Sequence, residues 1–308
     1  MITRYSTFSD DKGKTYVAYI MTNSSNESTL MIRSLVDNKT NLQIALGFNV
    51  TSTPFVMVDY KKHNAPKRKT LYIGDDKGKI YSASLLKSNG KLRSKAAIKT
   101  ALKSGAIASL DSSNTDSIRF IGSSVSSTDR AYYLRAQSET RLSVFKYDTQ
   151  KTKWNRVWSS FEGGSGQWQA DGTFTNSPSS IQHLPKGSTI TDNAYIVGDS
   201  IVLPVNTPDP TGTVCYGMAY YYLYKLSDGS FPKTRFYKLD DSAISGNIKI
   251  GYGKATRLVL SDLPDKDVLV GYAHAEQTTA KSTGVNDTFL IRDTMTTGVR
   301  SWRILDGL

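Results

Sequence analysis

The sequence contains very little cysteine and histidine, and each shortage excludes a kind of chemistry. The single cysteine, Cys215, cannot form an internal disulfide, and one thiol cannot build a structural zinc site. The three histidines, His63, His183 and His274, lie far apart without the spacing of metal ligands. A Gly-x-Ser-x-Gly nucleophile motif is also missing, and glutamate is scarce. The sequence therefore offers no recognisable zinc centre or hydrolase nucleophile.

Long apolar segments are missing as well. The sequence has no run of about 18 consecutive apolar residues, the length that a membrane-spanning helix requires. The first residues, MITRYSTFSDDKGKTYV, lack the charged and apolar regions of a secretion signal. We therefore expect no direct membrane span, and either a cytosolic protein or a piece of a longer secreted one.

What the sequence does contain favours an all-β fold. Its 308 residues include 18 Tyr, 10 Phe, 4 Trp and 23 Gly, and hydrophobic residues make up 38%. Aromatic residues are enriched in strands, and this apolar content is typical of a globular chain. The net charge of +12 favours anionic partners such as acidic glycans, lipid headgroups or nucleic acid. A basic surface without a specific anion is an equally good explanation.

Turn residues between apolar stretches predict a series of hairpins. We expect turns at Gly198-Asp199, Asp228-Gly229, near Pro264 and at Thr297-Gly298, since tight hairpins need residues that tolerate positive φ. Such turns recur at intervals of roughly 30 to 40 residues, close to one unit of a radial β architecture. The predicted fold is a β-propeller with irregular blades and long loop insertions, formed by residues 1–308 as a single domain.

Two segments depart from the strand pattern. Residues 93–104, RSKAAIKTALKS, place Ile98, Ala101 and Leu102 at helical spacing and predict one short helix. Residues 161–180 are rich in Gly and Ser and predict a long surface loop.

The stretch LYIGDDKGKIYSASL, residues 71–85, could be a phosphate loop, a metal loop or a hairpin turn. A phosphate loop leads into a helix whose N-terminus faces the anion. Here Gly78 is followed by KIYSASL, which is β-branched and aromatic. The sequence therefore predicts a turn between two strands, in which Asp75 and Asp76 bond to nearby backbone amides.

Acidic residues also gather at residues 111–116 (DSSNTD) and 262–267 (DLPDKD), which suggests calcium. Neither segment has the alternate spacing and closing carboxylate of a calcium loop, so turn chemistry explains both better.

Residues 9–16, SDDKGKTY, resemble the hairpin box S-x-D-x-G-x-T-aromatic of sialidase-like propellers. That box folds a hairpin and does no chemistry. A sialidase would also need an arginine cluster facing a Tyr-Glu pair, and nothing in the sequence marks such a pair. The resemblance therefore predicts a propeller hairpin rather than an enzyme.

Three longer segments, in the same order, resemble the PilY1/PilC family of type IV pilus tip proteins. Residues 52–85 resemble the family's strand, its VDLNGDGxxD loop and its VYAGDLQGNLWRFDL segment. Residues 187–240 resemble its two strands, cysteine-containing loop and hairpin, and residues 298–305 (GVRSWRIL) are similar to its C-terminal ending.

The resemblance implies the C-terminal β-propeller of a longer secreted protein, exported through the outer membrane to the cell surface. Such a protein sits at the pilus tip with the minor pilins, promotes pilus assembly against retraction and contributes to adhesion and twitching motility. Its partners would be minor pilins and a host-cell receptor or acidic glycan, without nucleic acid. We expect a non-catalytic adhesin module. The alternative is a carbohydrate-active or carbohydrate-binding propeller of sialidase type.

The family's calcium loop, DxNxDGxxD, is degenerate here. The equivalent residues are DYKKHNAPK, so Asp59 remains as a first ligand, while Lys61, His63 and Lys67 replace later ligands. Calcium takes about six to eight oxygen ligands, several of them preferably anionic. Two ammonium groups ~4 Å from the ion would repel it by several kcal/mol. We therefore expect no cofactor and no calcium at this loop.

The same replacements create a candidate anion-binding patch. Its members are Lys61, Lys62, Lys67, Arg68 and Lys69. The patch would suit an acidic glycan or an acidic pilin surface, and a solvated basic loop is the simpler alternative. Nucleic acid is disfavoured, because only one aromatic residue lies among these cations.

Calcium titration tests the degenerate loop. Isothermal titration calorimetry of the intact chain is expected to show no micromolar calcium uptake, because lysines replace the anionic ligands. Micromolar uptake that disappears in Asp59→Ala would contradict this expectation.

Overall fold

A computed structural model provides the structure of the chain. It describes residues 5–37, 41–59, 68–110, 116–160, 167–168, 174–175, 181–209, 212, 217–232, 235–255, 258–263, 268–273, 275–277 and 287–292. Within these residues the chain is mostly β-strand with a single helix, which confirms the all-β prediction.

Five antiparallel sheets follow one another along the chain. Sheet I has the order β1 (Tyr5–Ser9), β2 (Thr15–Thr22), β3 (Ser28–Ser34), β4 (Asn41–Ala45). Sheet II has the order β5 (Phe55–Asp59), β6 (Arg68–Gly74), β7 (Lys79–Ser84), β8 (Ala108–Ser109). Sheet III has the order β12 (Lys153–Ser159), β11 (Leu142–Asp148), β10 (Tyr132–Gln137), β9 (Phe120–Val125).

The last two sheets interleave in sequence. Sheet IV has the order β15 (Thr189–Ile190), β17 (Ser200–Thr207), β18 (Met218–Lys225), β20 (Ile248–Ala255), β23 (Ala275–Gln277), and β16 (Tyr195–Val197) also pairs with β17. Sheet V has the order β19 (Phe236–Tyr237), β24 (Asp287–Arg292), β22 (Val268–Ala273), β21 (Val259–Leu263). A separate two-stranded ribbon consists of β13 (Gln167–Trp168) and β14 (Phe174–Thr175).

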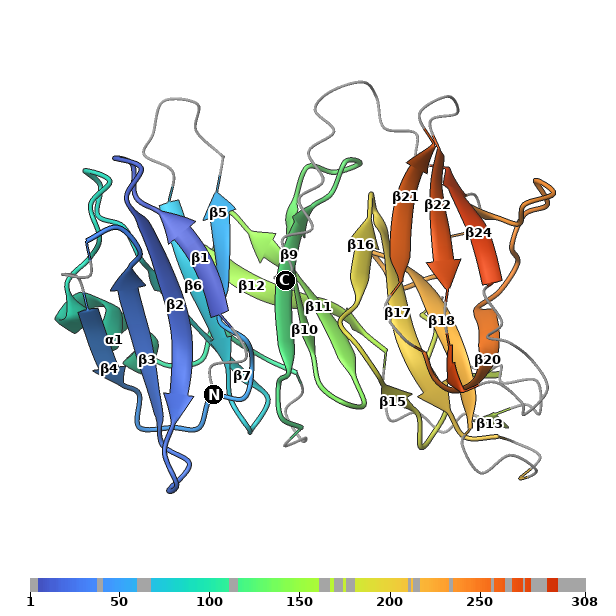
Figure 1. Cartoon of the computed structure of the whole chain (residues 1–308), viewed down its shortest axis with the longest axis horizontal. Helices are drawn as coiled ribbons and strands as arrows, with labels where there is room; N and C mark the ends of the chain where they lie inside the picture. The colour runs from blue at the N-terminus through green and yellow to red at the C-terminus, as the bar shows by residue number, and fades with distance from the viewer. Residues whose placement is uncertain are drawn as a thin grey trace.

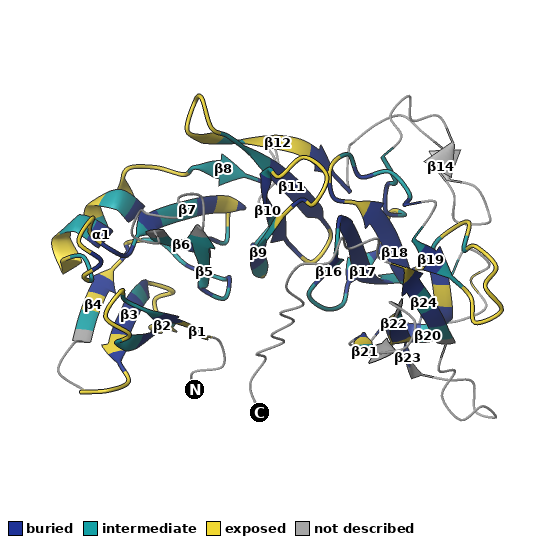
Figure 2. Cartoon of the chain, turned by 90° about the horizontal axis from the view of Figure 1, so that it is seen from above, coloured by how far each residue is buried: buried dark blue, intermediate teal, exposed yellow. Residues whose placement is uncertain are grey.

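The described sheets are arranged along an arc, with sheet I at one end and sheet V at the other (Figures 1 and 2). The first strands of sheets I to III line its inner side, where β1 lies beside β5 and β5 beside β9. Such radially repeated sheets are typical of propeller blades. Within the described residues, sheets I and V do not pair, so ring closure stays a prediction.

Four hydrophobic clusters fill the spaces between consecutive sheets. Leu71 and Ile73 of β6 join the cluster shared with sheet I, whereas Tyr72 joins the cluster shared with sheet III. In β18, Tyr221 and Leu223 face sheet V, and the alternate residues face sheet III. Because strand side chains alternate between faces, each middle sheet is buried on both sides. The aromatic run YYYLY, residues 220–224, is part of β18 and enters both clusters.

The same pentapeptide, DDKGK, forms two of the hairpin turns, at residues 10–14 and 75–79. In the second turn, Asp75 Oδ1 accepts hydrogen bonds from the amides of Lys77 at 3.0 Å and Lys79 at 2.7 Å. Gly78 adopts a φ of 73°, which glycine tolerates best. This confirms the turn between β6 and β7, with Asp75 bonded to backbone amides as predicted. Asp76 differs from the prediction, because its carboxylate accepts the side-chain amide of Asn49 at 3.2 Å.

The carboxylate that closes the hairpin between β1 and β2 does not belong to Asp11, the aspartate that matches the box. Asp10, rather than Asp11, accepts the amide of Lys14 at 2.9 Å. Asp10 also lies 3.3 Å from the hydroxyl of Tyr16. Burial, followed by the charge of Asp10, raises the pKa of Tyr16 to about 12. The box therefore folds a hairpin, as the resemblance implied.

The predicted helix is present as α1 (Lys95–Lys103). It begins after Ser94, whose side chain accepts the Ala97 amide at 3.3 Å, and it buries Ile98 and Leu102. No helix among the described residues is long and apolar enough to cross a membrane.

Three features of the fold differ from the predictions. The sheets begin at Tyr5, Phe55 and Phe120, so the units are longer than the predicted 30 to 40 residues, partly because α1 is inserted between β7 and β8. The turn at Asp228-Gly229 forms, but the chain then crosses to β19 in sheet V instead of pairing with β18. The predicted loop 161–180 contains the β13–β14 ribbon.

Of the other predicted turns, one is confirmed and two lie outside the described residues. The hairpin at Gly198-Asp199 is confirmed by the pairing of β16 with β17. Strands β21 and β22 pair as predicted, while Pro264 between them lies outside the described residues. Thr297-Gly298 also lies outside them.

Backbone strain at the repeated turn can be measured directly. Gly13 has a φ of 81°, and a Cβ placed there meets nothing within 4 Å. Gly13→Ala is therefore expected to lower the free energy of unfolding by about 1 kcal/mol through backbone strain alone. Gly246→Ala is the matched control, because its site is equally open and its φ is not positive. Equal unfolding midpoints for the two variants in urea would contradict this account.

Candidate functional site

The C-terminal ends of β5, β16 and β21 lie at one rim of the arc. The arrows of β5, β16 and β21 all point to this upper rim in Figure 1. A cavity of about 590 Å³ opens there between sheets III and IV. We call it the rim cavity; its lining residues are Ser126, Thr128, Asp129, Asp199, Lys225, Ser227, Ser230, Phe231, Pro232 and Arg235.

Sheet III supplies one wall through the turn between β9 and β10. Ser126 Oγ accepts the amides of Thr128 and Asp129, each at 3.2 Å. Asp129 in turn accepts the Ala131 amide at 3.0 Å, which closes the turn. Side chains of serine and aspartate commonly stabilise turns in this way. This turn therefore has a fixed shape before any ligand arrives.

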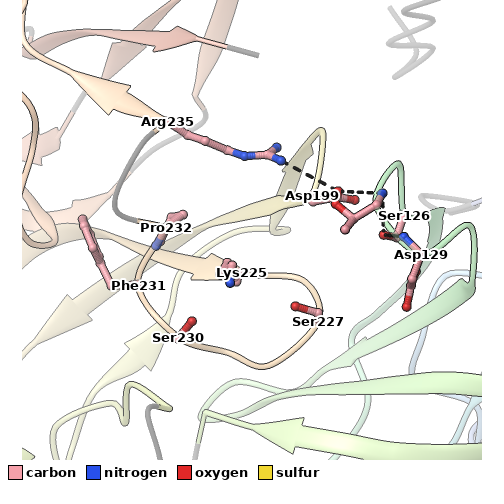
Figure 3. Close-up of a pocket in the computed structure, with 10 residues that line it drawn as sticks. Ser126, Asp129, Asp199, Lys225, Ser227, Ser230, Phe231, Pro232 and Arg235 are labelled. Atoms are coloured by element: carbon pink, nitrogen blue, oxygen red, sulfur yellow. Dashed lines mark hydrogen bonds and ion pairs between the residues drawn. The ribbon is translucent and has the colours of Figure 1, made fainter. Parts of the chain in front are cut away.

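Asp199 in sheet IV reaches across to that turn. Its carboxylate accepts the amide and hydroxyl of Ser127 at 2.9 and 2.7 Å, and those of Thr128 at 3.2 and 2.6 Å. Arg235 Nη2 lies 3.7 Å from Asp199 Oδ2 (Figure 3). We call Ser127, Thr128, Asp199 and Arg235 the Asp199 clasp, because they join three parts of the chain at the cavity.

Hydrogen bonds favour the ionised form of both cavity carboxylates. Burial alone would raise the pKa of Asp199, but the hydrogen bonds from Thr128 and Ser127 lower it below its usual value. Burial opposes the shift at Asp129 too, where the bonds from Lys146, the Ala131 amide and Tyr133 lower its pKa well below the usual range. A carboxylate held in this way is a poor general acid at neutral pH.

Sheet IV and the segment after it supply the opposite wall. Lys225 is the last residue of β18, and its Nζ lies 3.5 Å from Asp228 Oδ2 with half of the side chain exposed. The amide and hydroxyl of Ser230 bind Asp228 Oδ1 at 2.9 and 2.6 Å and shape the loop. Phe231 and Pro232 follow and give this side of the cavity an apolar surface (Figure 3).

Hydrogen bonds and a stacked pair of rings join sheets III and IV. The indole N–H of Trp158 donates to the carbonyl of Leu226 at 2.9 Å, and its ring stacks on Tyr224 with centroids 5.1 Å apart. Gln137 donates to the carbonyl of Asp192 at 2.7 Å and accepts the amide of Ala194 at 3.0 Å. These contacts hold the two walls in register, so the cavity is preformed.

The predicted anion-binding patch lies mostly outside the described residues, which exclude Lys61, Lys62, His63 and Lys67. The flanking residues Asp59 and Arg68 are the paired ends of β5 and β6 at the upper rim. The side chain of Lys69 donates to the carbonyl of Ser9. Lys69 therefore ties sheet II to sheet I, a role that the sequence did not indicate.

Within the described part of the chain, no group of three or more His, Cys, Asp or Glu side chains could hold a metal ion. Of the acidic segment 111–116, only Asp116 is described, and its carboxylate accepts the hydroxyls of Ser138 and Thr140. That contact joins Asp116 to the turn between β10 and β11, and the turn chemistry within residues 111–116 stays a prediction.

Sequence reasoning missed the residues that line the rim cavity. Gly198-Asp199 and Asp228-Gly229 were predicted as turns only, and Lys225 and Phe231 carried no motif. The sequence offers one signal for this site, and it is weak. A basic residue and an aromatic residue lie on either side of a Ser-Asp-Gly-Ser turn. Proximity of residues 126–129 to 225–235 arises only when sheets III and IV pack together.

No protein-family model and no curated protein matches the chain. Among solved structures, it is similar to a PL25 ulvan lyase bound to -[GlcA(1-4)Rha3S]-, with a TM-score of 0.39, 8% identity, and coverage of 94% of this chain and 64% of that one. The GH43 endo-arabinanase from Bacillus licheniformis gives a TM-score of 0.33 at 12% identity, with 94% and 93% covered. TolB from Acinetobacter baumannii gives 0.30 at 10%, with 94% and 55% covered.

These likenesses are distant. The chain spans less than two thirds of the length of the ulvan lyase. At such TM-scores and identities, they assign neither an activity nor a ligand to this chain, and the argument for function depends on its own residues.

The Asp199 clasp should stabilise the fold in a pH-dependent way. Asp199→Asn places an NH2 group opposite hydroxyl and amide donors, so we expect a loss of about 2 to 3 kcal/mol in the free energy of unfolding at pH 7. The native pKa lies below the unfolded value, so the carboxylate stabilises the fold above about pH 4 and the difference from wild type shrinks as pH falls below it.

Urea unfolding of both proteins at pH 7 and pH 3 measures this difference. Asp11→Asn, at an exposed turn carboxylate, is the control and should change stability by less than about 0.5 kcal/mol. A loss for Asp199→Asn that is the same at both pH values would show that the charge of Asp199 is not involved.

Proposed function

We propose that this chain is a non-catalytic binding module of propeller type. The observation that carries the proposal is the rim cavity: a preformed hollow whose two carboxylates, Asp129 and Asp199, already bind donors of the protein. An acid–base enzyme needs a carboxyl group with a pKa close to the working pH, whereas these shifts go the other way. Such a cavity suits ligand capture.

The biological setting we propose comes from the sequence resemblance to the PilY1/PilC family. In that setting the module sits at the tip of a type IV pilus on the cell surface, contacts minor pilins, promotes pilus assembly and contributes to adhesion. The upper rim supports a docking role, because it combines the rim cavity with the strand ends that flank the predicted basic loop. A protein with a net charge of +12 would attract acidic partners to such a rim.

A carbohydrate-binding propeller outside the pilus is the second candidate. The lining of the rim cavity favours it, because it contains an aromatic residue, Phe231, together with the hydroxyl-bearing Ser227 and Ser230. Aromatic faces and convergent polar groups are common in ligand pockets.

Deletion of the gene in the bacterium that encodes this chain tests the pilus proposal. We expect loss of most surface pili in electron micrographs, with their return when pilus retraction is also blocked, since the module would act against retraction. Re-expression of the wild-type protein should restore pili and adhesion.

Normal pilus numbers and normal adhesion in the deletion strain would overturn the pilus assignment. Cleavage of acidic polysaccharides by the purified chain, detected as new reducing ends and lost in Asp199→Ala, would overturn the non-catalytic assignment.

A further inference from the structure

We propose that the rim cavity binds an acidic sugar, with Lys225 meeting its carboxylate and Phe231 meeting the face of its ring. This inference rests on the proposed binding function and specifies its ligand class. It depends on three properties of the described lining residues: which polar atoms are already occupied, where the apolar surface lies, and where positive charge is available.

Acceptor groups in the rim cavity are largely occupied. Asp199 accepts four hydrogen bonds from Ser127 and Thr128. Asp129 accepts the Tyr133 hydroxyl at 2.8 Å and pairs with Lys146 at 2.7 Å. A ligand that mainly donates hydrogen bonds would have to displace these protein donors, which costs free energy.

Lys225, in contrast, has hydrogen-bond donors that a ligand can use. Its ammonium group has three N–H donors and only a 3.5 Å contact with Asp228, and both side chains are about half exposed. An exposed pair of this kind contributes little, so the lysine can turn to a ligand at small cost. Ser227 lies beside it on the exposed turn (Figure 3). The cavity therefore favours a ligand rich in acceptors, and a carboxylate is the best match for an ammonium group.

The apolar wall indicates that the ligand carries more than a charge. Phe231 lines the cavity and is partly buried against the core of sheets IV and V, and Pro232, which follows it, lines the cavity as well. A bare inorganic anion gains nothing from this wall, whereas the C–H face of a pyranose ring can pack on it. The volume of about 590 Å³ falls within the range of small-molecule sites and admits a sugar ring.

Saturation-transfer NMR with D-glucuronate, D-glucose and acetate at equal concentrations tests this inference. Glucuronate should receive strong transfer at its ring protons and bind at least about tenfold more tightly than either control, because each control lacks one of the two contacts. Equal binding of glucose would show that the carboxylate is not recognised, and equal binding of acetate would show that the ring is not. Either result, or no binding of glucuronate at millimolar concentration, overturns the proposal.

Variants of the two contact residues assign the site. Lys225→Ala should weaken glucuronate binding at least about fivefold, and Lys225→Arg should keep it within about twofold. Lys91→Ala, at an exposed lysine between β7 and α1, makes the same change in net charge and should have no effect. Equal losses in Lys225→Ala and Lys91→Ala would mean that general electrostatics, not this cavity, attracts the ligand.

Phe231→Leu tests the ring contact while keeping an apolar side chain in the core. It should weaken glucuronate binding about fivefold and leave the weak binding of acetate unchanged. Unfolding midpoints measured alongside confirm that each variant is folded. If glucuronate does not bind while the deletion strain still loses its pili, the ligand class is wrong and the proposed function stands. If glucuronate binds while the deletion strain keeps normal pili and adhesion, the pilus assignment is wrong and the ligand class stands.

Discussion

Burial of the middle sheets on both faces is the constraint on which the rest of the structure depends. In β6 and β18, alternate side chains enter two different hydrophobic clusters, so each sheet stabilises its neighbour on either side. Removing apolar surface from water is the main stabilising contribution in such packing. Once both faces of a sheet are used, only strand ends and turns are left to meet a ligand. The rim cavity lies where this constraint predicts a site, at the turns between two sheets.

Aspartates serve two distinct purposes at these turns. Asp10 and Asp75 bond to amides within their own hairpins and act locally. Asp199 looks the same in the sequence, in a Gly-Asp turn, yet its carboxylate bonds to a turn of the neighbouring sheet. The difference lies in what packs beside the turn, because a carboxylate accepts from whichever donors its surroundings provide. The carboxylate of Asp199 thereby joins sheet IV to sheet III.

Short-range sequence rules predicted much of the fold, but they did not predict the rim cavity. The hairpins at Gly198-Asp199 and Asp75–Gly78 and the helix at 95–103 follow from short-range rules on φ, periodicity and capping. The rim cavity combines residues 126–129 with 225–235, which lie far apart in the sequence. The candidate anion-binding patch was predicted because its basic residues lie close together in the sequence, yet Lys69 contacts the Ser9 carbonyl of another sheet.

The sequence by itself determined where the chain turns, which stretches are strands, and that aspartate and glycine build the hairpins. It did so because these choices depend on residues only a few positions apart. Only the tertiary structure decided that β19 leaves its sequence neighbours for sheet V, that Asp199 joins sheet IV to sheet III, and that Lys225 and Phe231 share a cavity. Those outcomes depend on which sheet faces packed together, and side-chain alternation alone does not specify the partner of a face.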